Sequence, residues 1–153
     1  METFRIQNLS FTYPGQSRPA LENLSLDVEQ GAFLVLCGQS GCGKTTLLRQ
    51  LKPSLAPHGT RTGTILFQGR PLESLDRREE SQRIGFVMQS PDNQLVTDKV
   101  WHELAFGLES LGLPTPVIRR RVAEMASFFG IEDWFHRESA ELSGGQKQLL
   151  ALA

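Results

Sequence analysis

The sequence is poor in cysteine, and its apolar runs are short. Only Cys37 and Cys42 occur among 153 residues, and one such pair without a second is a poor zinc site. The run Phe33–Cys37 is far below the roughly 20 residues that a membrane-spanning helix needs. The N-terminus lacks a basic stretch followed by an apolar one, which excludes a secretory signal. We therefore expect a cytoplasmic protein that reaches a membrane only through a partner.

The chain also lacks an excess of charge of either sign. Sixteen Lys and Arg residues face seventeen Asp and Glu residues, which gives a net charge of −1 and leaves no electrostatic footprint for nucleic acid. The short run Arg119–Arg121 is interpreted as a solvated helix face. With 39% hydrophobic and 22% charged residues, the composition is that of one globular domain, or a piece of one, and not of a disordered chain.

The spacing of apolar residues predicts the order of the elements. Alternation predicts half-exposed strands over 4–11 and 24–28, and a further strand is expected over 63–67. The unbroken apolar runs Phe33–Cys37 and Ile84–Met88 predict strands buried on both faces. Helices are expected from Gly43 or Lys44 to residue 51, over 75–82, over 100–111, over 118–129, and from near Ser143 onward.

A glycine-rich loop follows the first of the two unbroken apolar runs. Residues Gly38–Thr45 fit the phosphate-binding pattern G-x-x-x-x-G-K-T, in which glycines let several backbone N–H groups point at one anion. The next helix adds its positive end, Lys44 can reach the β- and γ-phosphates, and the Thr45 hydroxyl can bind Mg²⁺. The alternative is a glycine-rich turn with an incidental lysine. Because Cys42 lies in this loop, we expect its alkylation to block nucleotide binding.

A second glycine motif stands near the end of the chain. Residues Leu142–Gln148 read L-S-G-G-Q-K-Q, a serine N-cap and two glycines that open a helix toward an anion. Together the two motifs resemble the P-loop and the LSGGQ signature of ABC ATPases, and the resemblance covers the whole chain. The stretches Gln89–Val96 and Val100–Gly107 are similar to the ATPase subunits of energy-coupling factor (ECF) transporters, which include cobalt and vitamin importers.

The resemblance implies a fold and a domain plan. The expected class is α/β, a P-loop NTPase core of the ABC ATPase kind with N-terminal antiparallel β elements and an α-helical subdomain, and with the C-terminal part missing. The nucleotide-binding core, with P-loop and Q-loop, is expected over 1–90 and the helical subdomain over 91–142. Residues 143–153 carry the signature and the start of its helix.

The resemblance also assigns site residues for ATP and Mg²⁺. Tyr13 is the candidate aromatic for stacking on adenine, although it can also be a simple turn tyrosine. Gln89 is the Q-loop glutamine and, with Thr45, the candidate Mg²⁺ ligand. The ATP-binding residues implied are Tyr13, Gly38, Gln39, Ser40, Gly41, Cys42, Gly43, Lys44, Thr45, Thr46 and Gln89. The signature residues implied to bind the ATP of a partner subunit are Ser143, Gly144, Gly145 and Gln146.

Partners and activity follow from the same resemblance. It implies a second ABC ATPase subunit, in a homo- or heterodimer, an integral membrane component, and a place on the cytoplasmic face of the cell membrane, without nucleic acid. The Gln89 segment and the helix over 100–111 are the candidates for the membrane contact, although Val100, Leu104 and Leu108 can equally be core. The implied function is ATP hydrolysis that powers uptake of a metal ion or vitamin. The alternatives are a soluble ABC ATPase acting on nucleic acid or ribosomes, and a non-hydrolysing ATP-binding fragment.

One departure from the family pattern concerns catalysis. In ABC ATPases a Walker B aspartate and glutamate and a later histidine follow the signature, whereas this chain stops ten residues after Ser143. Its three histidines, His58, His102 and His136, all precede the signature. No catalytic residue is therefore predicted within the chain. We expect the 153-residue polypeptide alone to be poorly soluble and not to hydrolyse ATP.

Overall fold

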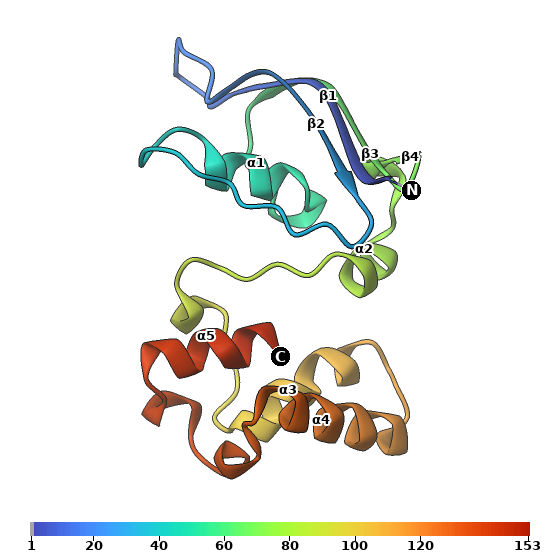
Figure 1. Ribbon diagram of the computed structural model, residues 1–153, viewed down its shortest axis with the longest axis vertical. Helices are drawn as coiled ribbons and strands as arrows, with labels where there is room; N and C mark the ends of the chain where they lie inside the picture. Colours follow the sequence, from blue (N-terminus) through green and yellow to red (C-terminus); the bar gives the residue numbers. More distant parts are fainter. Residues whose placement is uncertain (1) are drawn as a thin grey trace. The chain divides into compact units, whose positions relative to one another are not determined.

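Alternating apolar side chains build an antiparallel sheet in the first half of the chain. The structure, a computed structural model, describes residues 2–153 and divides into two units between Gly85 and Phe86. The sheet has the strand order β2-β1-β3-β4, and Figure 1 shows it in the first unit. Its strands are β1 (Glu2–Thr12), β2 (Leu21–Glu29), β3 (Thr60–Phe67) and β4 (Arg70–Pro71). All neighbours are antiparallel, so the predicted antiparallel N-terminal elements are confirmed.

The register of the sheet places every second side chain in the core. Ile6 of β1 pairs with Leu26 of β2 and with Ile65 of β3, and Ile6 and Ile65 are buried. The register shifts around Asn8, which has a positive φ of 50°. Across from it Gly63 lies so close that an added Cβ would stand 2.4 Å from the Asn8 carbonyl oxygen. A bulge of this kind keeps the residues on both sides of it facing the core.

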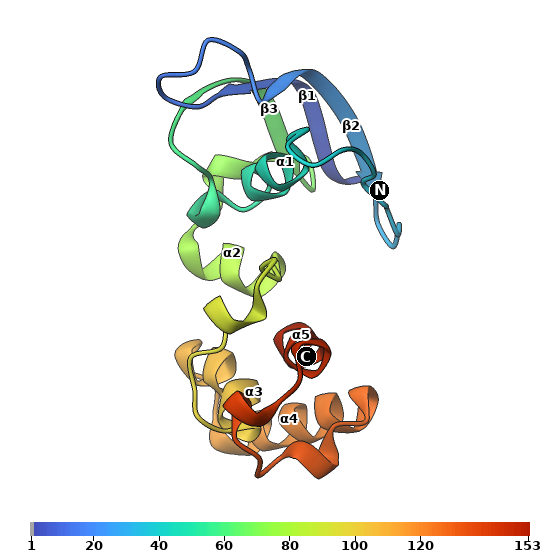
Figure 2. The same cartoon turned by 90° about the vertical axis from the view of Figure 1, so that its left-hand side faces the viewer.

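Two helices complete the first unit. Helix α1 (Lys44–Gln50) covers one face of the sheet (Figure 2), and its Leu47 belongs to the same core cluster as Ile6 and Phe11. Helix α2 (Arg77–Arg83) begins at Asp76, whose side chain accepts a hydrogen bond from the Glu79 backbone N–H at 2.7 Å. The predicted helix after the phosphate loop is confirmed, and it fixes that loop to the sheet.

Two predicted strands are wrong. Residues 33–37 and 84–88 are extended, but neither segment forms a strand within residues 2–153. A strand needs a neighbour for its backbone N–H and C=O groups, and no strand of the described chain pairs with these two segments. The expected burial on both faces is also absent for the first run, because Phe33 is 94% exposed and Val35 is 64% exposed.

The second unit is helical, as its periodicity predicts. It contains α3 (Val100–Ser110), α4 (Thr115–Phe129) and α5 (Gly144–Leu152). Pro116 lies in the first turn of α4, directly after the N-cap Pro114 and Thr115, and Gly130, with a φ of 64°, ends the helix. Proline early in a helix and glycine just after its end are both common. Val100 of α3, Ala126 of α4 and Leu150 of α5 share one buried cluster. Val100 is therefore core, as the plainer interpretation had it.

Short 3-10 helices connect the longer elements. They are η1 (Pro53–Leu55), η2 (Leu72–Ser74), η3 (Pro91–Asn93), η4 (Glu132–Trp134) and η5 (Ser139–Glu141). Over the described residues, no helix combines the length and apolar character that a membrane crossing requires.

Candidate functional site

The phosphate loop ends in a backbone conformation that favours glycine. Gly41 and Gly43 have φ values of 83° and 94°, in the left-handed region that side chains disfavour. Gly43 also touches the segment before β2, because an added Cβ there would lie 2.5 Å from the Ala20 carbonyl oxygen. Gly43 is the N-cap of α1, and its carbonyl accepts the Leu47 N–H at 2.8 Å. The loop is thus pressed against the β1–β2 connection and delivered to the helix start.

The Lys44 ammonium lies over this loop. Its Nζ donates hydrogen bonds to the carbonyl oxygens of Gly38 and Gln39, both at 2.8 Å. The Cys42 Sγ lies 3.6 Å from the same nitrogen. One cation therefore lies over a curl of backbone that leads into the start of α1, an arrangement suited to a phosphate. An anion bound here would compete with the two carbonyls for the Lys44 charge.

The two threonines after Lys44 have different surroundings. Thr46 is buried, and its Oγ1 shares a hydrogen bond of 3.0 Å with the Tyr13 hydroxyl. Thr45 is exposed, at the helix end that faces the loop. The Tyr13 ring also meets Phe11 edge-on, with ring centroids 4.9 Å apart. The structure therefore brings Tyr13 to the phosphate-loop helix.

A buried ion pair links the end of α1 to α2, and sequence reasoning missed it. Glu80 is 4% exposed and accepts hydrogen bonds from the Ser54 hydroxyl at 2.6 Å and from the Ser54 N–H at 3.1 Å. Lys52 Nζ lies 3.6 Å from the carboxylate and donates to the Ile84 carbonyl at 2.6 Å. Burial alone raises the pKa of Glu80, but the bonds from Ser54 and the Lys52 charge outweigh it, so this pKa lies below its usual value. No sequence signal separates Glu80 from its charged neighbours in α2.

In the second unit, a glutamine side chain closes the loop that carries Gln89. The Gln94 Oε1 accepts the Met88 N–H at 2.8 Å, and its Nε2 donates to the Phe86 carbonyl at 3.3 Å. Gln94 thus supplies two bonds that a neighbouring strand would otherwise make. Gln89 is exposed on the loop between. Sequence reasoning quoted Gln94 only as part of the ECF-like stretch and gave it no role.

The signature forms the N-terminus of α5 by a reciprocal cap. The Ser143 hydroxyl accepts the Gln146 N–H at 3.3 Å, and the Ser143 N–H donates to the Gln146 Oε1 at 2.9 Å. This is a capping box, which satisfies two helix-end groups at once. A methyl group added to Gly144 or Gly145 would meet no atom within 4 Å in the part of the chain that the structure describes. The fold of these residues therefore does not itself require either glycine.

The predicted site residues fall into two groups. Tyr13 and the loop Gly38–Thr46 belong to the first unit, whereas Gln89 and the signature Ser143–Gln146 belong to the second. Within the first group, Tyr13 contacts Thr46 of the loop. In the second, Gln89 lies on the loop that Gln94 closes, and Ser143 and Gln146 cap α5. No cluster of three or more His, Cys, Asp and Glu side chains arranged for a metal occurs among residues 2–153.

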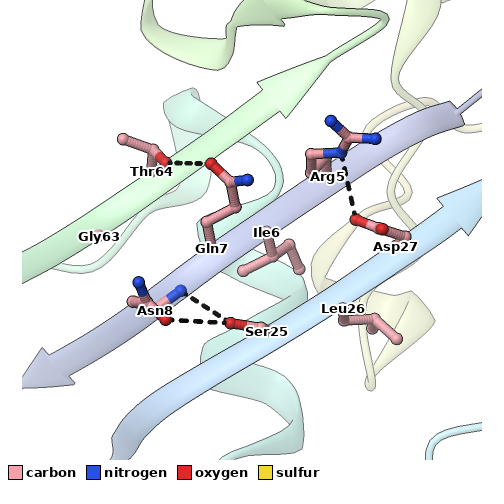
Figure 3. A pocket seen from close by; sticks show the side chains of 9 residues that line it. All are labelled: Arg5, Ile6, Gln7, Asn8, Ser25, Leu26, Asp27, Gly63 and Thr64. Atoms are coloured by element: carbon pink, nitrogen blue, oxygen red, sulfur yellow. Dashed lines mark hydrogen bonds and ion pairs between the residues drawn. The ribbon is translucent and has the colours of Figure 1, made fainter.

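A hollow of about 660 Å³ lies elsewhere, on the outer face of the sheet. Figure 3 shows that its polar side chains pair with one another across the strands. Arg5 lies 3.5 Å from Asp27, and Thr64 donates to Gln7 at 3.3 Å. None of the predicted site residues lines it. These mutual pairs mark it as a solvated sheet face.

Comparisons of the amino-acid sequence and of the fold relate this chain to the same group of known proteins. Residues 21–153 match the family described as ABC transporter. An ABC transporter ATP-binding protein of Bacillus cereus is 50% identical over 97% of this chain and 27% of its own length. The energy-coupling factor transporter ATP-binding protein EcfA1 of Lacticaseibacillus paracasei is 40% identical over 97% of this chain and 52% of its own.

Among solved structures, CbiO1 of Clostridium perfringens, part of the ABC transporter complex CbiONQ, superposes with a TM-score of 0.84. It is 28% identical, and the match covers 99% of this chain and 59% of that one. The predicted fold class is therefore confirmed. The chain spans between about a quarter and a half of the curated relatives named here.

Proposed function

The chain belongs to the ABC transporter ATP-binding family, and we propose that it is the ATP-binding part of an energy-coupling importer. In that function, MgATP binds on the loop Gly38–Thr45, and its hydrolysis in the full-length protein powers uptake of a metal ion or vitamin through a membrane partner. The observation that carries the proposal is the Lys44 ammonium held over a backbone curl that requires Gly43. ATP hydrolysis is the activity of full-length members of this family.

The residues of the first unit fit the phosphates and the magnesium ion. Backbone N–H groups of Gly41–Thr45 and the Lys44 charge would hold the β- and γ-phosphates. The exposed Thr45 hydroxyl would hold Mg²⁺, which neutralises phosphate charge. Thr46 supports the loop through the hydrogen bond between its hydroxyl and that of Tyr13. The remaining face of the Tyr13 ring is our candidate for adenine stacking.

The signature glycines support a role toward a second subunit. Glycine is a weaker helix former than alanine, yet the chain's own packing leaves room for side chains at Gly144 and Gly145. The presence of glycine at these two positions is explained if another molecule approaches the backbone closely there. We infer that Ser143, Gly144, Gly145 and Gln146 bind the ATP held by a partner ABC ATPase subunit.

The membrane partner is proposed from the relatives. EcfA1 is named as a transporter subunit, and CbiO1 is described as part of the CbiONQ complex. We place this chain by analogy on the cytoplasmic face of the membrane, bound to an integral membrane component. Co-purification of the full-length protein with a membrane protein supports this assignment, and co-purification with RNA instead contradicts it.

The test of the nucleotide site is Lys44→Ala in the full-length protein. Loss of charge-assisted hydrogen bonds worth about 1.5–3 kcal/mol should weaken ATP binding roughly 10- to 100-fold. Arg49→Ala removes an equal charge from an exposed position of the same helix and should leave the affinity unchanged. Binding of a fluorescent ATP analogue measures both. An unchanged affinity in Lys44→Ala would place the nucleotide elsewhere.

A further inference from the structure

The side chain of Tyr13 is held by two buried neighbours in the first unit. Its hydroxyl shares a hydrogen bond of 3.0 Å with the Thr46 Oγ1 of α1. Its ring meets the Phe11 ring at 88°, with the centroids 4.9 Å apart, a geometry that aromatic pairs prefer. Phe11 is 1% exposed and Thr46 is 7% exposed, whereas Tyr13 is half-buried. The Tyr13 ring is therefore fixed on its inner side and accessible from outside.

Gly59 is in turn pressed against Phe11. It directly precedes β3, whose Thr60 pairs with Thr12 of β1. A Cβ added to Gly59 would lie 2.5 Å from the Phe11 Cζ and 2.4 Å from the Thr12 carbonyl oxygen. Carbon atoms in contact stand about 3.5–4.0 Å apart. The Phe11 ring thus occupies the space that a side chain at position 59 would need.

Phe11 has little room to move away from such a side chain. It belongs to the same buried cluster as Leu21 and Leu47, and Tyr13 packs against that cluster. Protein interiors are close-packed and transmit strain. A shift of the Phe11 ring, or of the Thr12 backbone, would therefore be passed on to Tyr13.

We propose that Phe11 and Gly59 are positioning residues that orient the Tyr13 ring for a nucleotide base. The inference rests on the proposed function, in which Tyr13 stacks on adenine. A ring that is already held in its stacking orientation loses little freedom when the base binds, and this raises the affinity. Phe11 and Gly59 act only through Tyr13 and touch neither the base nor the phosphates.

Titration calorimetry of the full-length protein with ATP and with inorganic tripolyphosphate tests this role. Tripolyphosphate has a triphosphate chain but no base, so the ratio of the two affinities reports the base contact. Phe11→Leu and Gly59→Ala should each weaken ATP binding about 2- to 10-fold, the range of one aromatic edge contact. The affinity for tripolyphosphate should not change, although a general loss of stability would lower both affinities.

The same truncation near the other end of β1 is the matched control. Phe4 also packs against the core, and its ring centroid lies 5.0 Å from that of Phe67. Phe4→Leu should leave the affinity ratio at the wild-type value. An unchanged ratio in folded Phe11→Leu or Gly59→Ala overturns the proposal, and so does an equal change in Phe4→Leu. If thermal melting shows Phe11→Leu to be unfolded, Phe11→Met replaces it under the same criteria.

Tyr13→Ala separates this inference from the proposed function. It should weaken ATP binding roughly 5- to 150-fold, the range of one base–aromatic stack, and leave tripolyphosphate binding unchanged. An unchanged ratio in Tyr13→Ala would contradict the stacking assignment itself. A lower ratio in Tyr13→Ala but not in Phe11→Leu would contradict only the positioning role. Failure of the wild-type protein to bind either compound would contradict the proposed phosphate site.

Discussion

At the scale of single residues, Gly43 carries the strictest steric demand in the phosphate loop. Gly41→Ala introduces only a side chain in the left-handed region, at a cost of about 1–2 kcal/mol. Gly43→Ala adds a Cβ that would stand 2.5 Å from the Ala20 carbonyl oxygen, which should cost about 1–3 kcal/mol more. Urea unfolding of the two full-length variants measures the difference. Equal stability of the two would show that the Ala20 contact relaxes without cost.

Cys42 offers a chemical probe of the same loop. It is exposed, and its sulfur lies 3.6 Å from the Lys44 Nζ, so an alkyl group there would fill the space above the loop. We expect N-ethylmaleimide to abolish ATP binding and saturating ATP to slow the labelling, as followed by mass spectrometry.

The second cysteine makes this experiment internally controlled. Cys37 is also exposed but precedes the phosphate loop. A Cys42→Ala variant should keep its ATP binding after treatment with the reagent, whereas a Cys37→Ala variant should lose it. Labelling of Cys42 at the same rate with and without ATP would argue against a nucleotide on this loop.

At the scale of elements, the buried Glu80 holds α2 to the end of the phosphate-loop helix. Glu80→Gln removes the charge that accepts from Ser54 and attracts Lys52, and should lower stability at neutral pH by about 1–3 kcal/mol. Because the folded-state pKa of Glu80 is lowered, this stabilisation is complete above the unfolded-state pKa. It is lost as the pH falls through the folded-state pKa.

The stability difference between wild type and Glu80→Gln should therefore shrink on acidification. Urea unfolding of full-length proteins at neutral and at acidic pH measures it. Glu22→Gln, at an exposed position of β2, should match the wild type under both conditions. A Glu80→Gln difference that stays constant down to strongly acidic pH would mean that the carboxylate charge contributes nothing.

At the scale of the whole molecule, the exposed apolar run before the phosphate loop governs solubility. Phe33, Leu34 and Val35 are exposed and carry unpaired extended backbone, which favours association with other chains. We expect the polypeptide of residues 1–153, made alone, to sediment as aggregates.

Substitutions separate this run from other exposed apolar residues. Phe33→Asp with Val35→Asp should raise the soluble fraction of the 1–153 polypeptide, measured by centrifugation. Phe128→Asp, at an exposed aromatic position of α4, should change it little because that residue stands on a hydrogen-bonded helix. A soluble, monodisperse wild-type 1–153 polypeptide would contradict the expectation.

Local patterns sufficed for most elements and for the two glycine motifs. The alternation around Ile6 and the helical spacing from Val100 onward predict strands and helices that the structure contains. Gly43 and Ser143 act through their own backbone geometry and caps. Such features depend on residues a few positions apart, so the spacing of residue types is enough to reveal them.

The sequence by itself therefore determined the family, the glycine-rich turn before α1, the serine cap of α5 and the order of the helices. Only the tertiary structure decided that Phe33–Cys37 and Ile84–Met88 form no strands. A strand is defined by its hydrogen bonds to a neighbouring strand, and an apolar run alone does not specify that neighbour. It alone also joined Lys52 to Glu80 and Lys147 to Asp92. Charged residues far apart in sequence become partners because the packing of the chain brings them together, and the local spacing of residues does not predict such pairs.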